Sequence, residues 1–103
     1  MIPLLKHHHD ALHDLCRRYH VVRLEVFGSA AEADADADAR DVDFLVEFAP
    51  EQDLGPWMQH YFDLRDELAA LLGRPVDLVM PHSLRNPYFV REVNRTRRPL
   101  YAA

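Results

Sequence analysis

Three segments of the chain repeat apolar residues every three or four positions, which is the spacing of an amphipathic helix. The pattern predicts helices over residues 4–19, 57–72 and 84–97, the last of them bent near Pro87. The expected buried face of the first helix is formed by Leu5, His8, Leu12, Leu15, Cys16 and Tyr19. The expected face of the second is formed by Met58, Tyr61, Phe62, Arg65, Leu68, Ala69 and Leu72. Gly73 is expected to cap the C-terminal end of the second helix.

Three further segments alternate apolar and polar residues, as strands with one buried face do. The strand in "VVRLEVF" is expected to bury Val22, Leu24 and Val26. It leads into a tight turn at Gly28 and Ser29. The strand in "DVDFLVEF" is expected to place Val42, Phe44, Val46 and Phe48 on one face and Asp41, Asp43, Leu45 and Glu47 on the other. The strand in "PVDLVMP" is expected to separate Asp77 and Val79 from Val76, Leu78 and Met80.

The predicted order of elements is helix, strand, strand, helix, strand, helix, which indicates a mixed α/β domain. With 103 residues, 49% of them hydrophobic, we expect the chain to form one domain over residues 1–103 with a single core. A net charge of −5 argues against direct binding of nucleic acid, because phosphate contacts need a basic surface. No stretch is apolar for long enough to span a bilayer. Because Cys16 is the only cysteine, no internal disulfide can form, and we expect a cytoplasmic protein.

Asp41 and Asp43 are separated by one residue, so they project from the same side of a strand. Two neighbouring carboxylates repel each other unless a cation lies between them. Oxygen ligands of this kind suit Mg²⁺, which binds one or two carboxylates together with the phosphates of its substrate. With Asp77 from a later strand, three carboxylates can hold two Mg²⁺ ions for displacement at phosphorus. The alternative is that these acids are solvated at strand ends.

The turn at Gly28 and Ser29 supplies a second feature that suits a phosphate ligand. A glycine lets the backbone approach an anion closely, and the serine hydroxyl and backbone N–H groups are donors. Alternatively, Ser29 only ends the strand or caps a short helix. The specific signal is the combination of this turn, the paired acids on a strand and the third acid on another strand.

Other residues that can carry chemistry have simpler interpretations. We expect Cys16 to pack in the core, and His9 and His13 to lie on a solvated helix face. Three loop acids are expected to be solvated: Asp34, Asp36 and Asp38. The aromatic residues Trp57, Tyr61 and Phe62 are expected to lie mostly in the core, with Trp57 partly exposed as a surface for a partner.

This arrangement resembles the MNT type of minimal nucleotidyltransferase, within the DNA polymerase β-like nucleotidyltransferase superfamily. The resemblance runs through "CRRYHVVRLEVFGS", "DVDFLVEF", "GRPVDLVMP" and the terminal "PLY". It implies a small mixed sheet flanked by helices, with Gly28 and Ser29 holding the triphosphate of ATP. It also implies that Asp41, Asp43 and Asp77 bind Mg²⁺.

Several members of that family are antitoxins that transfer AMP from ATP to a tyrosine of a HEPN-type ribonuclease toxin. The resemblance therefore implies an Mg²⁺-dependent protein adenylyltransferase that forms a hetero-oligomer with such a toxin. The chain departs from the family in a longer acidic loop, in Glu32 where an arginine is usual, and in Arg40 where a serine is common. Glu32 favours an alternative, a catalytically weakened antitoxin that neutralises its toxin by binding alone. Action on RNA ends or an antibiotic has no support in the sequence, because we expect neither a basic groove with aromatics nor a second domain.

Overall fold

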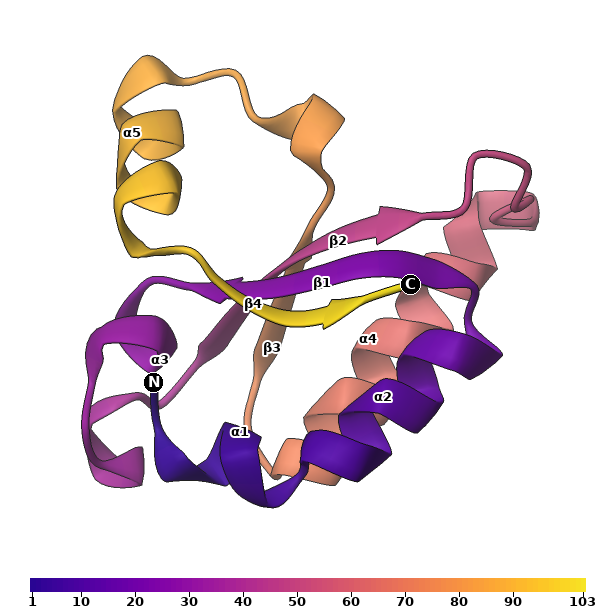
Figure 1. Cartoon of the computed structure of the whole chain (residues 1–103). Helices are drawn as coiled ribbons and strands as arrows, with labels where there is room; N and C mark the ends of the chain where they lie inside the picture. Colours follow the sequence, from indigo (N-terminus) through magenta and orange to yellow (C-terminus); the bar gives the residue numbers. More distant parts are fainter.

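A four-stranded mixed sheet lies at the centre of the structure, a computed structural model that describes residues 1–103 (Figure 1). The strands are β1 (Val21–Phe27), β2 (Val42–Phe48), β3 (Val76–Val79) and β4 (Arg98–Ala102). Their order across the sheet is β3-β2-β1-β4. β1 pairs antiparallel with β2 and with β4, whereas β2 and β3 are parallel. The predicted mixed α/β class is therefore confirmed.

The helices lie on both faces of this sheet. They are α1 (Pro3–His7), α2 (His9–Arg18), α3 (Ser29–Glu32), α4 (Gln59–Leu72) and α5 (Pro87–Thr96). Three short 3₁₀ helices are η1 (Asp36–Asp38), η2 (Pro56–Met58) and η3 (Pro81–Ser83). In Figure 1, α1, α2 and α4 lie on one side of the sheet and α5 lies on the other. None of the helices combines the length and apolar character needed to cross a bilayer.

The alternation along β2 divides the core into two parts. Val42, Phe44 and Val46 belong to a main cluster of 19 buried residues that includes side chains of α1, α2 and α4. Leu45 points to the opposite face, where it joins Phe27 in a small cluster beneath α5. Asp43 in β2 and Asp77 in β3 alternate with residues of the main core, so they lie on the same face of the sheet as α5.

Two details of the first helix and strand differ from the predictions. The predicted helix over 4–19 is divided at His8, whose φ and ψ of −102° and 19° are not helical. In β1, an irregularity in the pairing with β2 between Val21 and Arg23 shifts the alternation. As a result Val21 rather than Val22 belongs to the main core, while Leu24 is buried as predicted.

The predicted start and face of the second helix are also wrong in part. Trp57 and Met58 both have a φ of 57°, which no α-helix accommodates, so α4 begins two residues later than expected. Its buried residues are Leu64, Leu68 and Leu72. Trp57 is 92% exposed and Phe62 is 38% exposed, so neither is a core residue. The C-terminal cap at Gly73, with a φ of 66°, is confirmed.

The C-terminal region contains a strand that the pattern did not predict. α5 begins at Pro87 rather than at residue 84, because Asn86 caps it by accepting the N–H groups of Tyr88 and Phe89. A proline in the first turn of a helix removes no hydrogen bond, because the N–H groups of that turn have no partner within the helix. The predicted bend near Pro87 is therefore absent. The residues after α5 then form β4 at the edge of the sheet, where Pro99 is tolerated.

The acidic loop is hydrogen-bonded to α1 and to Arg74, so the prediction that all three of its acids are solvated is wrong for Asp36. The Asp36 carboxylate accepts the N–H of Leu4 in the first turn of α1, at 2.9 Å. Arg74 donates to the carbonyl oxygens of Asp36 and Ala39, and Ala39 is buried. Asp36 is therefore a helix cap in an anchored loop, whereas the other two predicted loop acids, Asp34 and Asp38, are exposed.

Candidate active site

Asp43 and Asp77 are paired directly across the parallel strands β2 and β3. Asp43 is partly buried and Asp77 is exposed, and both lie on the face of the sheet that carries α5. Burial, the charge of Asp77, the hydrogen bond that a protonated Asp43 can make to Asp77, and the charge of Asp41 raise the pKa of Asp43 to about 6. Every neighbouring charge that affects Asp43 is therefore negative.

Asp41 lies just before β2 with its side chain exposed. The negative charge of Asp41 contributes to the raised pKa of Asp43. However, no group of three His, Cys, Asp or Glu side chains in residues 1–103 is arranged to hold a metal ion. The structure thus brings two of the three predicted acids together as a pair and leaves Asp41 in solvent nearby. The donor set still suits Mg²⁺, because oxygen ligands with uncompensated negative charge gain from a hard cation.

Gly28 lies beside the Asp43 side chain, and its conformation and surroundings explain why a glycine is needed there. Its φ of 71° and ψ of −148° lie in a region that is essentially restricted to glycine. A Cβ atom at this position would lie 2.9 Å from Oδ2 of Asp43. The pairing of Phe27 with Asp43 in the sheet produces this approach, since Gly28 is the next residue along. Ser29, which is exposed, begins α3 immediately beyond.

Two residues of α5 that the sequence analysis did not single out contact this turn and the helix that follows it. Thr96 accepts the N–H of Gly28 at 2.9 Å, and Arg95 forms an ion pair with Glu32 at 2.7 Å. The negative charge of Glu32 is therefore offset by Arg95. No sequence pattern signals these contacts, because they join residues that are far apart in the chain.

The remaining candidates have structural roles. Cys16 is buried, as predicted, and burial raises the pKa of its thiol to about 12, so no thiolate is available at neutral pH. His9 and His13 stack with ring centroids 4.1 Å apart. His13 is not simply solvated, because its Nε2 lies 2.9 Å from the carbonyl oxygen of Leu100 in β4.

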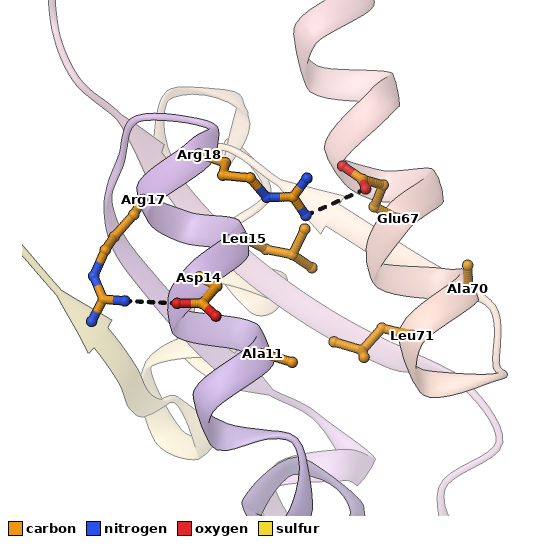
Figure 2. Close-up of a pocket in the computed structure, with 8 residues that line it drawn as sticks. All are labelled: Ala11, Asp14, Leu15, Arg17, Arg18, Glu67, Ala70 and Leu71. Carbon is orange, nitrogen blue, oxygen red and sulfur yellow. Dashed lines mark hydrogen bonds and ion pairs between the residues drawn. The ribbon is translucent and has the colours of Figure 1, made fainter.

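A groove of about 770 Å³ lies between α2 and α4 (Figure 2). An ion pair of 3.4 Å between Arg18 and Glu67 joins α2 to α4 across this groove. A second ion pair, of 2.8 Å, joins Arg17 to Asp14 within α2. Because α2 and α4 cover the other face of the sheet, this groove is separate from the acid pair. The acid pair lies outside it and is not among its lining residues.

Comparison with known proteins connects this geometry to a family. Residues 10–100 match the model of the nucleotidyltransferase domain. The protein adenylyltransferase MntA of Thermococcus cleftensis is 40% identical over 73 residues, which are 71% of this chain and 69% of that protein. A protein of Methanocaldococcus jannaschii assigned as a protein adenylyltransferase is 35% identical over 79 residues, or 77% and 76% of the two chains.

Solved structures share the fold. One assigned as a minimal nucleotidyltransferase is 35% identical, has a TM-score of 0.70, and covers 93% of this chain and 92% of that chain. A complex of a tri-AMPylated HEPN toxin with an MNT antitoxin, from Shewanella oneidensis, contains the same fold at 21% identity and a TM-score of 0.65. That match covers 96% of this chain and 73% of the other. The resemblance found in the sequence is thereby confirmed: the chain belongs to the nucleotidyltransferase domain family, as a minimal nucleotidyltransferase.

Proposed function

We propose that this protein is an Mg²⁺-dependent protein adenylyltransferase that transfers AMP from ATP to a tyrosine hydroxyl of a HEPN-type toxin. In this role it acts as the antitoxin and forms a hetero-oligomer with its substrate. The observation that carries the proposal is the direct pairing of Asp43 with Asp77, with Gly28 placed against Asp43. The relatives named as protein adenylyltransferases, and the fold shared with an MNT antitoxin in complex with an AMPylated toxin, support it.

In the proposed site, Asp41, Asp43 and Asp77 would hold two Mg²⁺ ions, and Gly28 and Ser29 would lie against the triphosphate. When bound, Mg²⁺ offsets the charge of the phosphates and of the departing pyrophosphate. The two carboxylates on adjacent strands need no rearrangement of the backbone to face one ligand, because the strand register already aligns them. Gly28 leaves the space beside Asp43 free of a side chain.

The reaction is a displacement at the α-phosphorus of ATP. The acceptor oxygen forms a bond to this phosphorus, the bond from the phosphorus to the oxygen of the β-phosphate breaks, and pyrophosphate leaves. The proton of the acceptor hydroxyl passes to the carboxylate of Asp77, which is exposed and can reach an incoming side chain. Asp43 is less accessible to the acceptor because it is partly buried between Gly28 and Asp77.

The second candidate function is neutralisation of the toxin by binding alone. The observation in its favour is Glu32, which stands where relatives usually have an arginine. The ion pair with Arg95 offsets this charge, and it thereby reduces the repulsion that Glu32 exerts on a triphosphate. We therefore favour the enzymatic role.

The two functions are separated by incubating the purified protein and its HEPN-type toxin with ATP labelled at either the α- or the γ-phosphate. Adenylyl transfer places the α label and not the γ label on the toxin, and it requires Mg²⁺. Asp43→Asn and Asp77→Asn should abolish the labelling, whereas Asp34→Asn, which changes an exposed loop acid, should leave it unchanged. An unlabelled toxin that still binds wild-type protein tightly would establish the binding-only function.

A further inference from the structure

The end of α5 is attached to the Gly28–Ser29 turn by a buried hydrogen-bonded hydroxyl. Thr96 is the last residue of α5, and its side chain is fully buried. Its Oγ1 accepts the N–H of Gly28 at 2.9 Å and donates to the carbonyl oxygen of Glu92, also at 2.9 Å. Both hydrogen-bonding roles of this hydroxyl are therefore filled within the protein. A buried hydroxyl with complete partners fixes the relative position of the groups it joins.

This contact acts on the backbone segment that shapes the candidate site. The N–H of Gly28 points to Thr96 and is not available to a ligand, so Gly28 contributes through its conformation and its lack of a side chain. Because even a Cβ atom on Gly28 would lie 2.9 Å from Oδ2 of Asp43, a shift of the turn changes the space around that carboxylate. The donors that remain in the turn belong to Ser29, and their direction depends on the same backbone.

Two neighbouring contacts hold α5 in place over the turn. Val93, one turn before Thr96, is fully buried against Phe27 and Leu45 on the same face of the sheet. Arg95 pairs with Glu32 at the other end of α3. This ion pair is about half exposed, so it contributes less to the position of α3 than the buried hydroxyl does. The attachment of the turn to α5 thus depends mainly on Thr96.

We propose that Thr96 is a positioning residue, which holds the Gly28–Ser29 turn in the conformation that accepts the triphosphate beside Asp43. The inference rests on the function proposed above as far as the ligand is concerned. The hydroxyl itself touches neither nucleotide nor acceptor. Its effect is transmitted through the Gly28 N–H, so it should appear in nucleotide affinity as well as in the dynamics of the turn.

A pair of substitutions tests this role. Thr96→Val keeps the size and shape of the side chain and removes the hydroxyl, whereas Thr96→Ser keeps the hydroxyl. We expect amide exchange at Gly28, followed by NMR without metal or nucleotide, to become about tenfold faster in Thr96→Val and to stay near wild type in Thr96→Ser. The dissociation constant of Mg²⁺-ATP should rise by about tenfold in the first variant and not in the second.

Several outcomes would overturn the inference. Unchanged exchange at Gly28 in Thr96→Val would show that the hydroxyl does not hold the turn. Faster exchange with unchanged ATP affinity would reduce Thr96 to a structural role. If wild-type protein binds no ATP, the proposed function fails, whereas the hold on the turn is still decided by the exchange at Gly28. Thr96→Ala removes the same hydroxyl and takes the place of the valine variant if that variant does not fold.

Discussion

Asp43 on β2 and Asp77 on β3 are register partners in the only parallel pair of strands of the sheet. Residues paired in this way lie side by side on one face, so the two carboxylates share one small region on the α5 side. Burial and, after it, the negative charge of Asp77 raise the pKa of Asp43, and no positive side chain offsets them. A protein retains such an arrangement at a cost in stability, which suits a site that binds a cation during function.

The first prediction concerns the effect of Mg²⁺ on stability. Mg²⁺ should raise the melting temperature of wild-type protein at neutral pH, because an ion that binds only the folded protein stabilises the folded state. Asp43→Asn should abolish most of this rise, and the metal-free variant should be at least as stable as wild type, since like-charge repulsion is removed. The affinity for Mg²⁺ should fall below about pH 6, where protons compete for Asp43. An equal Mg²⁺ effect in both proteins would contradict a metal site at Asp43.

The second prediction compares two glycines that both have positive φ. Gly28→Ala should destabilise the protein by about 1–3 kcal/mol and displace the Asp43 carboxylate, so that nucleotide transfer is lost. Gly73→Ala should cost about 1 kcal/mol and leave transfer intact, because no atom lies within 4 Å of the added Cβ. Chemical denaturation and the labelling assay measure the two effects. Retained activity in Gly28→Ala would disprove the close contact with Asp43.

The third prediction concerns the dependence of stability on pH. Glu25 is buried and accepts two hydrogen bonds from Arg97, both of 2.8 Å, and these contacts lower the pKa of Glu25. Because the folded-state pKa is below the unfolded value of 4.5, the stabilisation is complete above that pH and is lost as pH falls through the folded-state pKa.

Glu25→Gln provides the measurement of this contribution. The free energy of unfolding should be about 1.5–3 kcal/mol lower than that of wild type at neutral pH. The difference should shrink as the pH falls below 4.5, because wild type then loses the same charge. A difference that stays constant down to strongly acidic pH would show that the carboxylate charge of Glu25 does not contribute.

The fourth prediction tests the anchoring of the acidic loop. Asp36→Ala should lower the free energy of unfolding by about 1 kcal/mol, since the N–H of Leu4 loses its capping acceptor. Asp38→Ala, which alters an exposed acid of the same loop, is the matched control and should have little effect. Both variants should retain nucleotide transfer. Equal stability of the two variants would argue against the cap.

The sequence was sufficient to predict the strands that carry the acids, because their apolar residues alternate and the acids fall on the opposite face. It also led to Gly28 and to the family, since a turn after one strand and acids on two others form a specific combination. The cap at Gly73 was equally predictable, because a glycine with a proline two residues later, here Pro75, is a local signal. These features depend on residues that are close together in the chain.

The features that were missed depend on tertiary contacts. β4 pairs with the outer edge of β1, and its short segment, which includes Pro99, has no alternation that signals a strand. The positive φ of Trp57 shortens α4, and no local pattern announces it. No local pattern marks Thr96 and Arg95, yet they contact Gly28 and Glu32. Periodicity cannot identify such contacts, because it contains no information about what covers a face.

Adenylyl transfer to the toxin adds a defined mass to it, so the intact mass of the toxin decides whether the transfer occurs. The protein is co-expressed with its HEPN-type toxin, and the intact mass of the toxin is measured beside wild-type protein and beside the double variant Asp41→Ala/Asp43→Ala. We expect the toxin to gain the mass of one or more AMP units with wild type only. An unmodified toxin that is bound equally well by wild-type protein and by the variant would contradict the transferase and leave binding alone as the function.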